Sequence, residues 1–120
     1  MGKKESFISY LDRQTSEAQN NITRLIKDNR RDEANFEKIR VNIYQMLKTV
    51  FQAASRICSS EEEQIKFFSA RLKMNDEAWS AALAKATQHN DAARILQEKV
   101  KLEVMSEVKE TFEKIWEVTV

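Results

Sequence analysis

The sequence predicts an all-α protein in which residues 1–120 form a single domain, an up-down-up-down four-helix bundle. Three observations lead to this fold class. The chain has one glycine and no proline, whereas a sheet protein of this size needs several tight turns built from those residues. Apolar residues recur at spacings of three and four, which is the period of a helix. The apolar content of 42% is sufficient for a folded core.

The first half of the chain is predicted to form two helices, over roughly residues 4–28 and 32–58. Their apolar stripes comprise Phe7, Leu11, Ala18, Ile22, Leu25 and Ile26, and then Phe36, Ile39, Ile43, Met46, Val50, Ala53 and Ile57. Basic residues end the first segment and acidic residues open the second, as the dipoles of two abutting helix ends favour. The spacing nevertheless continues backward from Phe36 without a skip. Fusion of helices 1 and 2 into one long helix of an extended dimer is therefore the alternative.

The second half is predicted to form two further helices, over roughly residues 61–88 and 91–118. Their stripes comprise Ile65, Phe68, Leu72, Trp79, Leu83 and Ala86, and then Ile95, Leu102, Met105, Phe112 and Trp116. Ser60 and Glu63 have the spacing of a capping box, and Asn90 or Asp91 can cap the last helix. The dipeptide Asn75-Asp76 interrupts the third segment, where we expect a kink or a polar core position, with a true break as the alternative.

Composition excludes several classes of site. A P-loop, a dinucleotide-binding turn and an EF-hand all need internal glycines, and the only glycine is Gly2. The single cysteine excludes an intrachain disulfide and any multi-cysteine metal site. No apolar run approaches the roughly 20 residues that a membrane helix needs. We therefore expect no membrane partner and a cytoplasmic location.

No catalytic, cofactor-binding or metal-binding residue is predicted. His89 is the only histidine, and Ala86 stands where a di-metal bundle would carry a glutamate. Cys58 lies at a helix C-terminus, where the dipole disfavours a thiolate, and only His89 could serve as its base. The consecutive residues Glu61, Glu62 and Glu63 point about 100° apart on a helix and so cannot face one ion. We interpret them as compensating a helix N-terminus.

The sharpest basic patch comprises Arg24, Lys27 and Arg31, which share one helical face. Phosphates or an acidic partner would suit it. However, Asp28 and Asp32 lie among these cations, no aromatic residue is interleaved for base stacking, and the net charge of the chain is +1. A helix C-terminus accounts for the patch, and nucleic acid is not the partner that we expect.

The second helix is unusually apolar. Val41, Tyr44 and Phe51 lie beside its main stripe and widen the apolar sector to about 240°. Either this helix is the most enclosed one of the bundle, or these three residues form an interface with another copy or a partner helix. The resulting hypothesis is a non-enzymatic helical-bundle interaction protein that self-associates as a homodimer or binds another helical protein. The alternative is a ligand- or metal-binding bundle, or a small enzyme, with its site inside the bundle.

Overall fold

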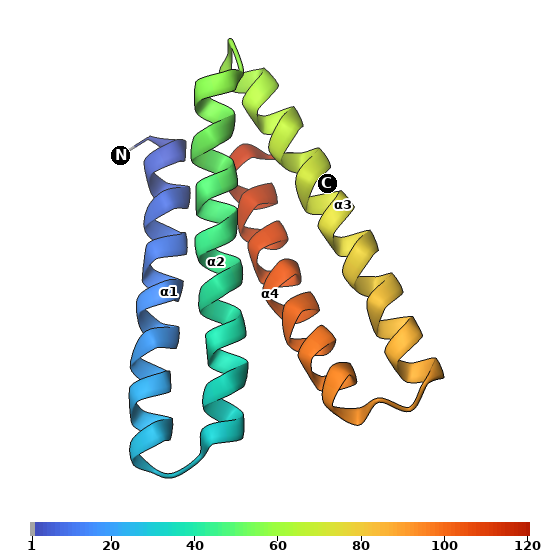
Figure 1. Ribbon diagram of the computed structural model, residues 1–120. Coiled ribbons are helices and arrows are strands. Elements are labelled where there is room, and N and C mark those ends of the chain that lie inside the picture. The colour runs from blue at the N-terminus through green and yellow to red at the C-terminus, as the bar shows by residue number, and fades with distance from the viewer. Residues whose placement is uncertain (1) are drawn as a thin grey trace.

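The computed structural model describes residues 2–120 as four α-helices without a strand, and 88% of the chain is helical. The helices are α1 (Lys3–Lys27), α2 (Arg31–Ile57), α3 (Glu61–Gln88) and α4 (Ala92–Trp116). They run alternately down and up (Figure 1), so the predicted fold class is confirmed. The alternative of one fused helix is wrong, because the chain reverses between α1 and α2. The alternative of a break at Asn75-Asp76 is also wrong, because α3 continues through both residues.

Two of the turns show how a chain without internal glycine reverses direction. The residue after the C-cap of α1 is Asn29, with φ 63°, and the residue after the C-cap of α3 is Asn90, with φ 53°. In each turn the next amide reaches five residues back: Arg30 N donates to Leu25 O at 2.8 Å, and Asp91 N to the Ala86 carbonyl oxygen at 3.0 Å. These bonds belong to Schellman motifs, in which asparagine replaces glycine in the left-handed conformation.

Side-chain caps fix the starts of α3 and α4. Ser60 Oγ accepts a hydrogen bond from Glu63 N at 3.2 Å, as predicted. The Glu63 carboxylate, however, accepts from the amide and hydroxyl of Ser59, at 3.1 and 2.9 Å, one residue earlier than in a standard capping box. Asp91 rather than Asn90 caps α4, since Asp91 Oδ1 accepts from the backbone amide of Arg94 at 3.1 Å. These bonds satisfy amides that have no partner within the helix.

The two hairpins, α1–α2 and α3–α4, meet at one end and diverge toward their turns (Figure 1). The principal extents of the molecule are 46 × 35 × 22 Å. An aromatic cluster with rings from all four helices holds the joined end together, with centroids 4.9–5.6 Å apart. Its members are Phe7, Phe51, Phe68, Phe112 and Trp116. Burial of such large rings and their edge-to-face contacts make this end the main core.

Candidate functional site

The structure encloses the three residues that the sequence suggested as an interface. Val41 is 8% exposed, and Tyr44 and Phe51 are each 2% exposed. Because α2 contacts α1, α3 and α4, it uses its broad apolar sector within the chain. This agrees with the interpretation of α2 as the most enclosed helix. The prediction that Val41, Tyr44 and Phe51 form an outward contact edge is therefore corrected.

Tyr44 also makes a polar contact between the hairpins. Its phenolic hydroxyl donates to Glu107 Oε2 at 2.9 Å. Burial, together with this bond to a carboxylate, raises the pKa of the Tyr44 phenol above its ordinary value. One turn earlier, Arg40 Nη2 donates to Glu103 Oε2 at 2.7 Å. These two bonds connect α2 to α4 and so join the two hairpins. We assign them a role in stabilising the fold.

The basic patch lies at the far end of the α1–α2 hairpin. Arg24, Lys27 and Arg31 are all exposed there. Arg24 Nη2 donates to Asn21 Oδ1 at 3.2 Å. Asp28, which follows Lys27 in the sequence, is exposed as well. Arg24 and Lys27 lie in the last turn of α1, whereas Arg31 is the first residue of α2. The prediction that the three residues share one helical face is therefore wrong, because the chain turns between Lys27 and Arg31.

Cys58 and His89 lie at opposite ends of α3. Cys58 is the C-cap of α2, just before α3 begins, and His89 is the C-cap of α3. A helix of 28 residues is about 42 Å long. His89 therefore cannot act as a base for Cys58, and the one nucleophile–base pair that the sequence offered is not assembled.

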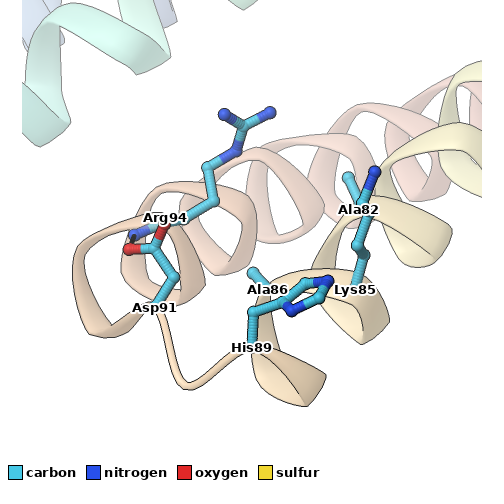
Figure 2. Close-up of a pocket in the computed structure, with 6 residues that line it drawn as sticks. All are labelled: Ala82, Lys85, Ala86, His89, Asp91 and Arg94. Carbon is cyan, nitrogen blue, oxygen red and sulfur yellow. Dashed lines mark hydrogen bonds between the residues drawn. The ribbon is translucent and has the colours of Figure 1, made fainter.

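A shallow pocket of about 230 Å³ lies at the α3–α4 turn (Figure 2). It is lined by Ala82, Lys85, Ala86, His89, Asp91 and Arg94. The Asp91 carboxylate is occupied by capping α4. The Arg94 guanidinium points away from His89 in Figure 2 and donates from Nε to Glu98 Oε1 at 3.0 Å. The polar groups of this pocket therefore do not converge on a common point.

Glu98 is a buried charge that the sequence analysis missed. The residue is 0% exposed, and its Oε1 accepts from Arg94 Nε at 3.0 Å and from Lys101 Nζ at 3.1 Å. Lys101 also lies 5.8 Å from the ring centroid of Trp79, a cation–π contact. A signal for this burial was present, because Glu98 lies three residues after Ile95 and four before Leu102 on the stripe of α4. The cluster neutralises a carboxylate within α4.

Within residues 2–120, no group of three or more histidine, cysteine, aspartate or glutamate side chains is placed to hold a metal ion. Over the same described residues, no helix combines the length and apolar character needed to cross a bilayer.

The outer side of α3 carries a second apolar stripe, which the sequence analysis did not identify. This outer stripe comprises Phe67, Ala70, Met74, Ala78 and Ala81, spaced by three, four, four and three residues. Phe67 is 40% exposed and Met74 is 54% exposed, and the three alanines are exposed as well. The opposite side of α3 holds Phe68 and Leu72, which are both fully buried. The spacing was visible in the sequence, but only the packing shows which apolar side is free.

Packing of the four helices does not account for the outer stripe, because its apolar side chains are exposed in the single chain. Helix capping accounts for the Asp91 carboxylate in the pocket at the α3–α4 turn. In the Glu98 cluster, both ion pairs are made by Oε1, while Oε2 is buried without a hydrogen-bond partner. Comparison with known proteins adds no candidate: no protein-family model, curated protein or solved structure matches this chain.

Proposed function

We propose that this protein is a non-enzymatic helical interaction protein that works in the cytoplasm by self-association or by binding another helical protein. The observation that carries this proposal is the outer stripe of α3. Phe67 and Met74 lie exposed on the same side of one helix, with one alanine between them and two after Met74. A contiguous apolar stripe on a solvent-facing helix is typical of a surface that another helix covers.

Side-chain size supports a helix as the occupant. Ala70, Ala78 and Ala81 leave room for a second helix to approach closely, while Phe67 and Met74 project as knobs. Methionine also adapts its shape to a partner surface at small cost. Charged residues, among them Lys73 and Glu77, border the stripe and are exposed. An apolar centre with a polar rim is the usual composition of a protein–protein contact.

The non-enzymatic part of the proposal rests on how the reactive groups are dispersed. Cys58 and His89 are separated by the length of α3, and the buried carboxylate of Glu98 is held by Arg94 and Lys101. Buried chemistry needs polar groups that converge on one substrate position. The cytoplasmic part rests on the single free cysteine, Cys58, which suits a reducing compartment.

A photo-crosslinking amino acid placed at position 74 tests this function directly. In extract of the native cell, we expect the label at Met74 to give covalent adducts with another polypeptide, either a second copy or a different protein. The matched control places the same label at Leu96, an exposed apolar residue on α4 that is 51% exposed. Adducts at Met74 that equal those at Leu96 in amount would contradict the proposal.

A second test shows whether Cys58 or His89 takes part in this interaction. Cys58→Ser and His89→Ala should leave the yield of the Met74 adducts unchanged, because neither residue belongs to the outer stripe. Loss of the adducts in either variant, with an unchanged thermal melt, would show that one of these residues takes part in the function.

A further inference from the structure

We propose that the outer stripe of α3 binds the same stripe of a second copy of this chain, with the two α3 helices antiparallel and Met74 on the two-fold axis. This inference rests on the proposed function and specifies its partner. Figure 1 places α3 at one edge of the molecule, with its partners α2 and α4 on the other side. A second α3 helix can therefore lie along the stripe without displacing another element.

The sizes of the stripe residues are complementary about Met74. Phe67 lies seven residues before Met74, and Ala81 lies seven residues after it. Ala70 and Ala78 lie four residues to either side. In an antiparallel pair centred on Met74, the large ring of Phe67 therefore meets the small Ala81 of the second copy, and this happens twice by symmetry. Large side chains opposite small ones allow two helices to pack closely.

The charges at the ends of the stripe select the same arrangement. Glu63 lies eleven residues before Met74 and Lys85 eleven residues after it, and both are exposed. The antiparallel pair brings each Glu63 opposite Lys85 of the second copy. A parallel pair would instead bring like charges together at both ends, which is unfavourable.

Two further features favour this arrangement. Lys73 and Glu77 lie on the same border of the stripe, one residue before and three residues after the axis. The antiparallel pair therefore places Lys73 within about 3 Å, along the helix axis, of the level of Glu77 of the second copy. The hydrogen bonds from Ser59 also hold the Glu63 carboxylate in place and lower its pKa, which favours the charged form that would face Lys85.

Single cysteines in a Cys58→Ser background test the register. A disulfide requires Cα atoms within about 7 Å. In the Met74→Cys variant, the two substituted positions lie next to each other at the two-fold axis. This variant should therefore form a covalent dimer at least about tenfold faster than the exposed control Leu96→Cys. In the Ala81→Cys dimer the two thiols are about 21 Å apart along the helix axis, so this chain should oxidise no faster than the control. A mixture of Phe67→Cys and Ala81→Cys chains should form the mixed disulfide.

Charge reversal tests the pairing of the stripe ends. In the Met74→Cys background, Lys85→Glu places two carboxylates opposite each other and should slow dimer formation about threefold. Adding Glu63→Lys reverses both partners and should restore the rate. Thermal melts of every variant confirm that each chain is folded. Failure of the double reversal to restore the rate, with the fold intact, would overturn the pairing.

The failure of this inference and the failure of the proposed function can be distinguished by their outcomes. Fast oxidation of Ala81→Cys, equal to that of Met74→Cys, would indicate a parallel pair and overturn the antiparallel inference. Oxidation of Met74→Cys at the rate of Leu96→Cys would overturn self-association through α3. If the photo-label at Met74 still formed an adduct with a different protein, the proposed function would stand while this inference failed. If that label gave no specific adduct either, both would fail.

Discussion

Phe51 lies beside the main stripe of α2, and the fold uses it as one ring of the aromatic cluster. Its centroid is 5.0 Å from that of Phe7 and 5.2 Å from that of Phe68. The sequence showed that Phe51 is apolar and where it lies on the helix. It could not show which neighbour covers Phe51, because a second copy and the chain's own α1 and α3 would produce the same pattern.

The Phe51→Glu substitution follows from this placement. It removes a fully packed ring and leaves a carboxylate without a partner in an apolar cluster, so we expect destabilisation by more than about 4 kcal/mol. The expected result in circular dichroism is a chain that is unfolded or melts at much lower temperature. Leu96→Glu, at an exposed position, is the control and should change the melting temperature little. A folded Phe51→Glu chain with a near-normal melting temperature would show that the ring is not in the core.

Glu98 is the residue at which sequence reasoning failed most clearly. The helical spacing places it on the buried stripe, but a carboxylate is rarely buried without a partner. Arg94 and Lys101 are those partners, four residues before and three after. The pairing could have been anticipated from these intervals.

We expect Glu98→Ala to reduce the free energy of unfolding by about 1–3 kcal/mol. The expected loss is smaller than the usual cost of breaking a buried ion pair. The side chains of Arg94 and Lys101 are 56% and 28% exposed, so both can be hydrated once the carboxylate is removed. Glu98→Met fills the space without a buried charge and should cost less than Glu98→Ala. Urea unfolding of the three proteins measures both differences. An equal loss in both variants would contradict this expectation, because it would show that the side-chain volume contributes nothing and that the whole loss comes from the ion pair.

The helix boundaries were largely predictable from the sequence. The third helix was predicted at 61–88 and is observed as Glu61–Gln88, and the other boundaries differ by no more than two residues. This accuracy has a local cause, since capping side chains and terminal charges act within one turn of the helix end. The left-handed conformation of Asn29 was not predicted, because Asn is only one of several residues that can end a helix this way.

The cap of α3 should make stability depend on pH. Hydrogen bonds from Ser59 to the Glu63 carboxylate lower its pKa below the ordinary value of 4.5. A group whose pKa is lower in the folded state stabilises the fold above its unfolded pKa and loses that contribution as pH falls through the folded pKa. We therefore expect Glu63→Gln to lower the melting temperature at pH 7 and to have a smaller effect below pH 4. Melts at both pH values test this, and an effect of equal size at both would contradict the assigned cause.

The arrangement of the two hairpins was the least predictable feature. A periodic stripe shows that one side of a helix is covered, but it does not show what covers it. On α2, the broad apolar sector turned inward except at its last residue, Ile57, which is 69% exposed, whereas α3 kept an apolar stripe on its outer side. The difference depends on where the neighbouring helices lie. That is a property of the whole packing rather than of either segment.

The divergence of the hairpins predicts uneven local stability. The aromatic cluster secures one end of the molecule, and the α1–α2 turn lies far from it (Figure 1). Amides that open locally exchange faster than those that open only on global unfolding. In hydrogen-exchange mass spectrometry, we expect peptides around residues 22–36 to exchange faster than peptides around residues 44–54 of α2. Equal protection in both regions would show that the hairpin opens only with the whole molecule.

Self-association through the outer stripe of α3 is the central claim about the whole molecule. Two Phe67 and two Met74 side chains would become covered, and each is worth about 1.5–3 kcal/mol when fully buried. Because each side chain is already partly covered in the single chain, the free energy gained on dimerisation is about half of the sum for the four side chains. It is comparable to the lower estimates of about 4 kcal/mol for the cost of association. We therefore expect a weak dimer whose population rises with concentration.

Sedimentation velocity of the wild type and of Met74→Glu tests this claim most directly. At tens of micromolar, the wild-type chain of 14.0 kDa should sediment with a mass that rises toward about twice that value, since a micromolar dissociation constant corresponds to a modest free energy. Met74→Glu should sediment as a monomer with an unchanged thermal melt, because Met74 is 54% exposed in the single chain. A wild type that stays at the monomer mass throughout, or a Met74→Glu chain that still dimerises, would contradict the claim.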